Sequence, residues 1–243
     1  MLKDKVAIIT GGTRGIGFAI VRKFLQNGAK VALLGSRQES VDRALQHLQK
    51  EGFTAIGFCP KLSDEDALRK CFKQVEKAYG KVNILVNNAG VASGTRLIDY
   101  TESEENSIVE LNFMGVYKTC KAVVPFMTNG GVILNASSVV SLYGQSVGCL
   151  YPATKYAVNG LTKSLSRELA DKNIRVNAVA PGVTDTDMVR NLPENLVKPL
   201  IDKIPLKRFA TAEDIANAYM FLASDMASYI TGVVLSVDGG AMI

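Results

Sequence analysis

Tyr151 and Lys155 are the two residues of this sequence whose types and spacing most clearly suggest chemistry. They lie four residues apart in a segment of helical pattern, so a helix would place both side chains on one face. A phenol has a pKa of about 10 and exchanges protons poorly near neutral pH. Because a nearby ammonium group favours the phenolate, Tyr151 would act as a general acid toward a ketone or as a general base toward an alcohol.

A glycine-rich segment near the N-terminus predicts a dinucleotide-binding loop. The strand-like run 5–10 leads directly into Gly11, Gly15 and Gly17 and then into a helical pattern. In such loops the glycines permit a tight turn, a close approach of the backbone to a pyrophosphate, and close packing of helix on strand. Amide groups at the start of the helix then face the anion. The spacing, G-x-x-x-G-x-G, matches the general fingerprint only approximately.

The end of the second predicted strand favours NADP over NAD. A carboxylate about 20 residues beyond the glycines usually holds the ribose 2′-hydroxyl of NAD, but Ser36 and Arg37 stand there in this chain. A hydroxyl and a guanidinium suit a 2′-phosphate, and Arg14 in the glycine loop supplies a second cation. The alternative is that Arg37 faces only solvent.

Short β-branched runs alternate with helical segments along the whole chain. This alternation predicts an α/β fold with a single doubly wound parallel sheet, of the Rossmann type, and helices on both faces. We expect residues 1–243 to form one domain, in which a proline-containing segment at about 184–208 covers the substrate. The predicted strands are 5–10, 30–34, 54–58, 82–86, 132–136, 174–179 and 233–237, and the predicted helices are about 16–27, 38–51, 64–79, 104–127, 152–171 and 212–224.

The composition argues against several classes of function. No apolar run reaches the roughly 18 residues of a membrane span, and the N-terminus is too short and too charged for a signal peptide, so we expect a cytoplasmic protein that binds no membrane. The net charge of +5 is scattered, which argues against a nucleic-acid partner. His47 is the only histidine, so neither a Ser-His-Asp hydrolase nor a histidine-ligated metal site fits. The four cysteines lack metal-binding spacing, and we expect mostly buried, reduced thiols and no metal.

Six short motifs occur in the order and at the spacing of one enzyme family. They are 10–17 (TGGTRGIG), 87–90 (NNAG), Asn112, Ser138 thirteen residues before Tyr151, 151–155 (YPATK) and 181–186 (PGVTDT). On these residues the chain resembles the short-chain dehydrogenase/reductase family over essentially its whole length. The resemblance implies a nicotinamide-dependent oxidoreductase that interconverts a ketone and a secondary alcohol.

The resemblance also implies a role for each matched residue. Tyr151 would transfer the proton, Ser138 would hydrogen-bond the substrate oxygen, and Asn112 would anchor a water molecule in a proton relay. Lys155 would hold the nicotinamide ribose and bias the ionisation of Tyr151. The residues that would bind the cofactor are Gly11, Thr13, Arg14, Gly15, Ile16, Gly17, Ser36, Arg37, Leu62, Asn88, Ala89, Gly90, Tyr151, Lys155, Pro181, Gly182, Val183 and Thr186.

Two positions keep alternatives open. Ser137 lies beside Ser138 and could supply the hydroxyl instead, although the thirteen-residue spacing favours Ser138. Where the family usually has an aspartate that binds the adenine amino group, this chain has Lys61. A lysine cannot accept that hydrogen bond, while the backbone of Leu62 could still serve.

Two subgroups of the family share segments with this chain. The segments 204–206, 212–217 and 229–240 resemble bacterial 3-oxoacyl-acyl-carrier-protein reductases, and 8–19 with 236–239 also resembles bacterial bile-acid hydroxysteroid dehydrogenases. The reductases tend to carry a basic cluster for the acidic carrier protein between the 104–127 helix and the next strand. In this chain that link, 127–131, has no cation, and Lys172 would be a partial substitute. The steroid enzymes tend to carry an acid near position 36 or 37, which this chain lacks.

The sequence therefore favours an NADP(H)-dependent reductase of 3-oxoacyl thioesters, with the acyl carrier protein as a candidate partner. The alternative substrate is a hydroxysteroid. A third interpretation, from another class, is a sensor that binds a dinucleotide without turnover. Such a sensor would be expected to lack Tyr151 or Lys155, and both are present.

The predicted helices 104–127 and 152–171 carry apolar residues around more of their circumference than one sheet contact needs. Examples are Val116, Val123, Val124 and Phe126. The family resemblance implies that these helices pair across two-fold axes in a homotetramer, with the C-terminal segment 233–243 in a second interface. The alternative is that these residues pack inside the monomer.

Overall fold

Seven parallel strands form the centre of the molecule. The computed structural model describes residues 1–128, 130–185 and 194–241. In this part of the chain the strands are β1 (Val6–Thr10), β2 (Lys30–Leu34), β3 (Ile56–Phe58), β4 (Ile84–Asn87), β5 (Gly131–Ala136), β6 (Ile174–Pro181) and β7 (Val234–Val237). They pair in the order β3-β2-β1-β4-β5-β6-β7, so the predicted α/β fold with a doubly wound parallel sheet is confirmed. Every predicted strand is present, with ends that differ by at most two residues.

The strand order changes direction at the centre of the sheet. Strands β1 to β3 extend from the centre to one edge, and β4 to β7 extend from the centre to the other edge. The carboxyl ends of the adjacent strands β1 and β4, Thr10 and Asn87, are register partners. Open parallel sheets bind their ligands beyond the carboxyl ends of the strands at such a switch point.

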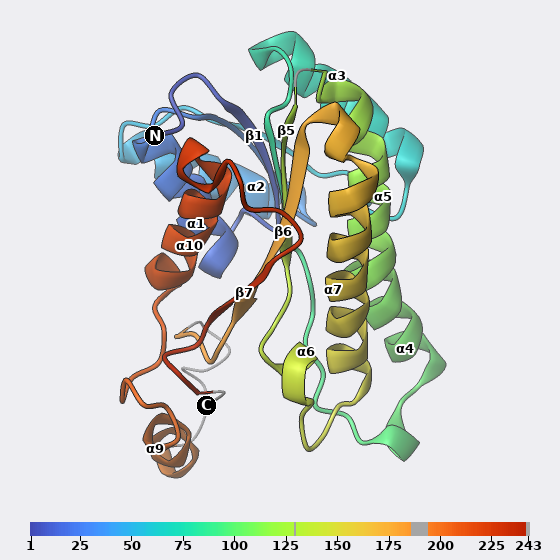
Figure 1. The fold of residues 1–243 in the computed structure, drawn as a ribbon, viewed down its shortest axis with the longest axis vertical. Coiled ribbons are helices and arrows are strands. Elements are labelled where there is room, and N and C mark those ends of the chain that lie inside the picture. The colour runs from blue at the N-terminus through green and yellow to red at the C-terminus, as the bar shows by residue number, and fades with distance from the viewer. Residues whose placement is uncertain (129, 186–193, 242–243) are drawn as a thin grey trace.

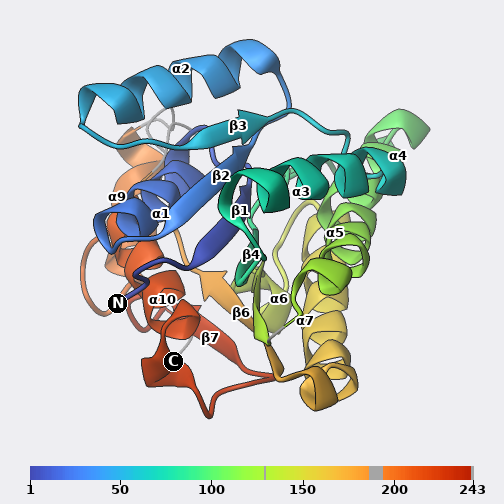
Figure 2. The same ribbon diagram turned by 90° about the horizontal axis from the view of Figure 1, so that it is seen from above.

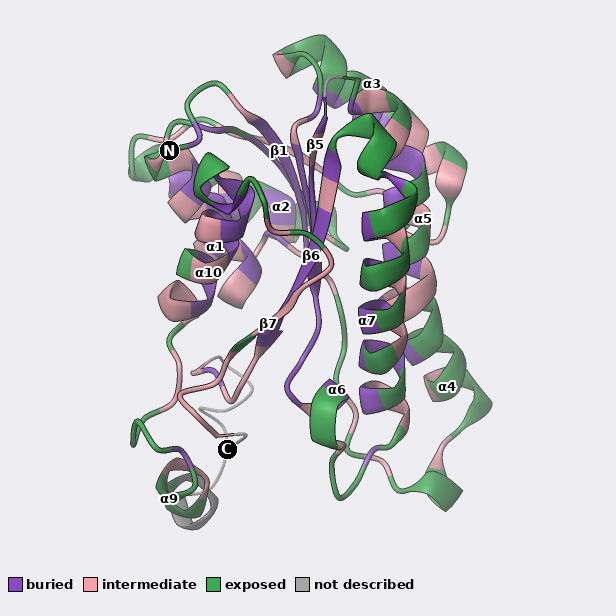
Figure 3. Cartoon of the chain, in the orientation of Figure 1, coloured by how far each residue is buried: buried purple, intermediate pink, exposed green. Residues whose placement is uncertain are grey.

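Helices cover both faces of the sheet, so successive residues of one strand enter different cores (Figures 1 and 2). Ile9 packs with α1 (Gly15–Gln26), α2 (Gln38–Lys50) and α10 (Ala212–Ala223). Its neighbour Ile8 packs with α3 (Glu65–Tyr79), α5 (Gly115–Val123) and α7 (Leu150–Glu168). Strand interiors are therefore buried on both sides, while the outer faces of the helices are exposed (Figure 3). This explains why the strands read as apolar runs without alternation.

The helix predicted at 104–127 is not continuous. It consists of α4 (Glu102–Val109), a π-helical turn η2 (Glu110–Met114), α5, and a 3-10 turn η3 (Val124–Phe126). A π turn adds one residue to a helix and occurs mainly at functional sites. Here it contains Asn112, whose side chain is fully buried.

Three helix ends have signals in the sequence: Ser63 and Thr211 each stand before acidic residues, which predicts helix starts there, and the pair Asn27-Gly28 predicts a helix end. Thr211 caps α10 in a reciprocal pair with Asp214, and α1 ends at Asn27, followed by Gly28 with a φ of 85°; both agree with the sequence. The predicted cap of α3 was wrong by one residue, because Asp64, and not Ser63, accepts the hydrogen bond from the Ala67 N–H at 3.0 Å.

Several other features differ from the sequence expectations. The helix α6 (Val140–Tyr143) was not predicted. The segment 184–208, in which the sequence predicts a short amphipathic piece, contains α9 (Glu194–Asp202), and its residues 186–193 are outside the described residues. Cys71 and Cys120 are buried, but Cys59 and Cys149 are exposed, so the thiols are not mostly buried. In the described part of the chain no helix has both the length and the apolarity to cross a membrane.

Candidate active site

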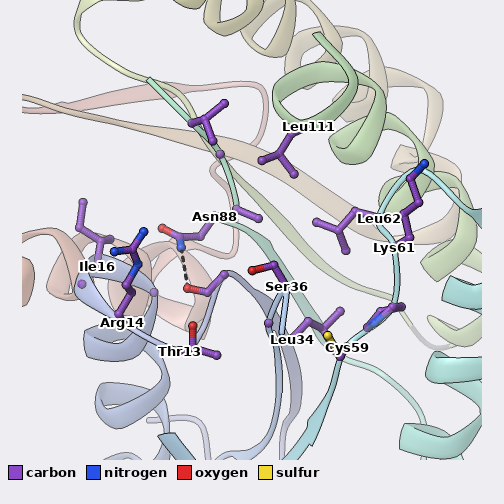
Figure 4. A pocket seen from close by; sticks show the side chains of 18 residues that line it. Thr13, Arg14, Ile16, Leu34, Ser36, Cys59, Lys61, Leu62, Asn88 and Leu111 are labelled. Atoms are coloured by element: carbon purple, nitrogen blue, oxygen red, sulfur yellow. Dashed lines mark hydrogen bonds between the residues drawn. The ribbon is translucent and has the colours of Figure 1, made fainter. Parts of the chain in front are cut away.

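A cleft of about 640 Å³ lies at the carboxyl ends of β1 and β4 (Figure 4). Its walls come from the glycine loop, the end of β2, and the segments that follow β3 and β4. Eleven residues that the sequence assigns to the cofactor line it: Gly11, Thr13, Arg14, Gly15, Ile16, Gly17, Ser36, Leu62, Asn88, Ala89 and Gly90. Arg37 is not among the lining residues; it is exposed and stands at the N-cap of α2.

The glycine loop is built for close backbone contacts and for an anion. A Cβ atom at Gly17 would lie 2.1 Å from the carbonyl oxygen of Gly11, so no other residue fits there. The φ of Gly11 is 65°, a conformation that favours glycine. The N-cap of α1 is Arg14, whose side chain makes no capping hydrogen bond. The first amide groups of α1 are thus available to a phosphate, and the loop fits the pyrophosphate of a dinucleotide.

Asn88 ties the loop after β4 to the glycine loop. Its Nδ2 donates to the carbonyl oxygens of Thr10 and Gly11, both at 3.3 Å; Figure 4 draws the second of these bonds. In return the hydroxyl of Thr10 accepts hydrogen bonds from the backbone N–H groups of Asn88 and Ala89, each at 3.0 Å. The two loops at the switch point therefore form one rigid unit.

The helix α7 brings Tyr151 and Lys155 to the same face. The Nζ of Lys155 lies 5.8 Å from the centre of the Tyr151 ring and donates to the carbonyl oxygen of Ala136 at 2.8 Å. Burial lowers the pKa of Lys155 to about 8. Burial also raises the pKa of Tyr151 above its usual value, and a hydrogen bond with Ser138 only partly opposes this. The phenol therefore carries its proton near neutral pH.

The structure separates the two neighbouring serines. Ser137 lies in a buried cluster, where its hydroxyl donates to the Asn159 Oδ1 at 2.6 Å and lies 2.9 Å from the Ser141 Oγ. The hydroxyl of Ser138 accepts only a long 3.4 Å hydrogen bond from the Val140 N–H, besides its contact with Tyr151. Ser138 is thus the serine placed to meet a substrate beside Tyr151.

Asn112 joins the loop after β4 to α7. Its Nδ2 donates to the carbonyl oxygen of Val91 at 2.8 Å and to the hydroxyl of Thr154 at 3.3 Å, and its Oδ1 accepts from the Val91 N–H at 2.9 Å. A Cβ atom at Gly90 would lie 3.0 Å from this Oδ1 and 3.5 Å from the Lys155 Nζ. The predicted residues Gly90, Asn112 and Lys155 therefore meet at one place. The water-anchoring role of Asn112 stays a prediction.

Thr154 is a residue of this cluster that the sequence analysis did not single out. It lies between Tyr151 and Lys155, and besides its contact with Asn112 it donates to the carbonyl oxygen of Tyr151 at 2.7 Å. Its place inside the motif 151–155 was the only signal for it in the sequence.

The predicted nicotinamide segment lies beside the Ser138 turn. The carbonyl oxygen of Pro181 accepts a hydrogen bond from the Val139 N–H at 3.1 Å, and Gly182 donates to the Val237 carbonyl oxygen at 2.9 Å. Val183 follows, and its carbonyl oxygen accepts from the Ala210 N–H at 3.0 Å. Thr186 lies outside the described residues.

Lys61 and Leu62 diverge at the far end of the cleft. Figure 4 shows the Leu62 side chain directed toward the cleft and the Lys61 side chain directed away from it. The Nζ of Lys61 lies 3.3 Å from the Glu110 carboxylate, and both side chains are largely exposed. Lys61 therefore makes a surface ion pair with the π turn, and its charge is not directed at the adenine end.

A family model described as Enoyl-(Acyl carrier protein) reductase matches residues 11–242. The chain belongs to the short-chain dehydrogenase/reductase family. This short-chain dehydrogenase/reductase is therefore an oxidoreductase that acts on CH–OH groups with a nicotinamide dinucleotide.

Three relatives cover nearly the whole chain. A 3alpha-hydroxysteroid dehydrogenase of Mediterraneibacter gnavus is 57% identical over 99% of this chain and 98% of its own length. The 3-oxoacyl-[acyl-carrier-protein] reductase FabG of Chlamydia muridarum is 40% identical, with the same two coverages. FabG of Thermotoga maritima is 38% identical over 100% of this chain and 99% of its own.

A solved structure has the same fold. It is described as a blue fluorescent protein from a metagenomic library in complex with NADPH, and it superposes with a TM-score of 0.92 at 32% identity over 100% of this chain and 99% of its own.

Proposed function

We propose that this short-chain dehydrogenase/reductase is an NADP(H)-dependent 3α-hydroxysteroid dehydrogenase. The observation that carries the proposal is the 57% identity, over almost the full length of both chains, to a protein named for that activity. The sequence motifs alone favour the acyl-thioester reductase slightly, and both classes occur among the relatives. Near the proposed site, Tyr143 and Val147 are 58% and 43% exposed, and such apolar surface suits a sterol.

The second candidate function is reduction of a 3-oxoacyl thioester, which the FabG relatives favour. An acyl carrier protein would be the partner in that case. The acidic carrier would have to bind to basic residues at another place on the surface, because the link 127–131 has no cation and Lys172 is a single exposed lysine. For that reason we rank this function second.

In the proposed mechanism, the chain's residues bind the cofactor, hold the substrate oxygen and move one proton. The glycine loop would bind the pyrophosphate of the cofactor, and Lys155 would hold its ribose. When bound in its reduced form, the cofactor would supply a hydride for the ketone carbon. Ser138 hydrogen-bonds the oxygen as its negative charge develops. Tyr151 then donates its phenolic proton to that oxygen, so that one hydride and one proton convert C=O to CH–OH. In the reverse direction Tyr151 would act as the phenolate and accept the proton of the alcohol.

The test is a set of ketones offered with NADPH. We expect turnover of a 3-oxo bile acid at least about ten-fold more efficient than of the 7-oxo and 12-oxo isomers or of an acetoacetyl thioester. Highest efficiency with the thioester would replace the proposal by the acyl reductase. Tight NADPH binding without turnover of any ketone would favour the dinucleotide sensor.

We expect NADPH to bind more tightly than NADH. Arg14 and Ser36 line the cleft, whereas Arg37 follows Ser36 in the chain and is exposed outside the lining. A 2′-phosphate beside Ser36 would meet a hydroxyl and the Arg14 cation, and the exposed Arg37 side chain would have to turn toward it. Arg37→Asp should reverse the order of affinity, because removing one charge-assisted hydrogen bond costs about 1–3 kcal/mol. The Michaelis constants for NADPH and NADH measure this preference. The control is Arg43→Asp, which makes the same charge change elsewhere on α2. Equal Michaelis constants for the two cofactors in the native protein would contradict the prediction.

We also propose that the enzyme is a cytoplasmic, single-domain homotetramer. Val116 and Val123 are buried in the monomer core, and Val124 and Phe126 pack against it, so these four residues do not support the interface. Support comes instead from Tyr117 and Tyr156, which are 41% and 50% exposed on α5 and α7. Light scattering at micromolar concentration should give about four chain masses; a species of one chain mass would refute the tetramer.

A further inference from the structure

The amide of Gln145 is the meeting point of three backbone carbonyl groups. It lies in the segment 144–149, which connects α6 to α7. Its Nε2 donates to the carbonyl oxygens of Val147 at 2.5 Å and Gly148 at 2.8 Å within this segment. It also donates to the carbonyl oxygen of Ser93 at 3.1 Å, in the loop after β4. One side chain thus connects two loops that are 52 residues apart in the sequence.

Gly148 transmits this contact to the proposed catalytic helix. Its carbonyl oxygen accepts the Gln145 amide and also the N–H of Tyr151 at 3.3 Å. A Cβ atom at Gly148 would lie 2.2 Å from the Ser93 carbonyl oxygen, and the φ of Gly148 is 84°. The two loops are therefore in close contact where the backbone enters the first turn of α7.

The Ser93 loop is itself firmly held. The hydroxyls of Ser93 and Thr95 donate to the same Oε1 of Glu104, at 2.8 and 2.6 Å. Two residues earlier, the N–H and carbonyl of Val91 bind the amide of Asn112. Gln145 is therefore attached to a loop that α4 and the π turn fix from two sides.

These hydrogen bonds, with the backbone between them, form a closed ring that includes the first turns of α7. From α7 the ring passes through Thr154 and Asn112 to Val91, runs along the loop to Ser93, and returns through Gln145 to the start of α7. Gln145 is the only side chain of the segment 144–149 that contributes to it in the described structure.

The segment that Gln145 fixes also carries apolar side chains. Val147 belongs to it, and Tyr143 and Leu142 come just before it at the end of α6; all three are substantially exposed. The hydroxyl of Tyr156 donates to the Leu142 carbonyl oxygen at 2.9 Å, which attaches α6 to α7. Gln145 supplies the corresponding attachment at the other end of this apolar surface.

We propose that Gln145 is a positioning residue that fixes the segment 144–149, and thereby the apolar surface that receives a bulky ketone beside Tyr151. The proposal rests on the proposed function to the extent that Tyr151 is the proton donor. Gln145 touches neither cofactor nor reacting atoms. Its replacement therefore raises the Michaelis constant for a bulky substrate more than it lowers the turnover number.

The first test is Gln145→Leu, which keeps the size of the side chain and removes the amide. For the 3-oxo bile acid, or whichever bulky ketone of the set the native enzyme reduces best, we expect the Michaelis constant to rise about five-fold or more, because the variant loses the two N–H groups that the three carbonyl oxygens share. For a small ketone both constants should change less than about two-fold. NADPH affinity and thermal midpoint should stay native. Ser146→Ala, at the exposed neighbour, is the matched control. A native Michaelis constant in Gln145→Leu, or an equal effect of Ser146→Ala, would overturn the proposal.

The second test uses Gln145→Glu and a readout that a mere change in packing would not move. A carboxylate facing three carbonyl oxygens is disfavoured, so the pKa of the introduced carboxyl is raised; once protonated, it donates a hydrogen bond again. The ratio of variant to native kcat/KM should therefore increase several-fold from pH 8 to pH 6, while the ratio for Gln145→Leu stays flat. Native titratable groups of the neighbouring segments, which include Glu104, Tyr143, Cys149, Tyr151, Tyr156 and Asp238, are present in both proteins, so the ratio removes the pH dependence that the two proteins share. A pH-independent ratio for Gln145→Glu would contradict the proposal.

Absence of bulky-ketone turnover in the native enzyme would instead contradict the proposed function.

Discussion

Tyr151→Phe will lower turnover at least about 100-fold while NADPH affinity stays within about two-fold of native. The change keeps the ring, which Lys155 approaches to 5.8 Å, and removes the proton that the phenol would transfer. Burial raises the pKa of Tyr151, so the native hydroxyl carries its proton near neutral pH and is ready to donate it to a ketone. Steady-state kinetics and a fluorescence titration with NADPH measure the two quantities.

A second tyrosine of α7 provides the control. The hydroxyl of Tyr156 is exposed and donates only to the Leu142 carbonyl oxygen, so Tyr156→Phe should change turnover less than about three-fold. A Tyr151→Phe protein that turns over at a near-native rate would reject Tyr151 as the proton donor.

Ser138 and Ser137 should respond in opposite ways to replacement by alanine. Ser138→Ala removes a hydrogen bond to the developing charge, and turnover should fall about 100-fold with little change in stability. Ser137→Ala leaves the buried Asn159 Oδ1 without its donor, so the free energy of unfolding should fall by about 1–3 kcal/mol. At a temperature where it is folded, Ser137→Ala should keep most of its turnover.

Denaturant unfolding and steady-state kinetics on both variants separate the two roles. If Ser137→Ala abolished the activity and Ser138→Ala lowered the stability, the assignment of the two hydroxyls would have to be exchanged.

Local patterns predicted the elements that are proposed to bind the phosphate. Gly11 is needed because its backbone is left-handed, and Gly17 because a Cβ atom there would lie 2.1 Å from the Gly11 carbonyl oxygen. The spacing of both glycines after a strand predicted them. The capping pair of Thr211 and Asp214 was likewise readable, because its partners lie three residues apart. Each of these features depends on residues close together in the sequence.

Features that depend on distant contacts could not be predicted in this way. The spacing to Tyr151 favoured Ser138, but only the cluster with Ser141 and Asn159 explains what Ser137 does instead. The link from Gln145 to Ser93 crosses two loops, for which no periodicity exists. The position of Arg37, outside the cleft lining, depends on where α2 begins.

The π turn also changes how the hydrophobic pattern of its helix must be read. Ile108, Asn112, Val116 and Cys120 recur at every fourth residue, and all are buried. In an uninterrupted α-helix each residue turns the chain by about 100°, so a four-residue step overshoots by about 40° and three steps displace the stripe by about 120°. The added residue of the π turn returns most of this angle and keeps the stripe in phase with the sheet. Removing one residue from the turn would straighten the helix, but it would rotate Ile108 and the whole of α4 away from the face on which α5 packs.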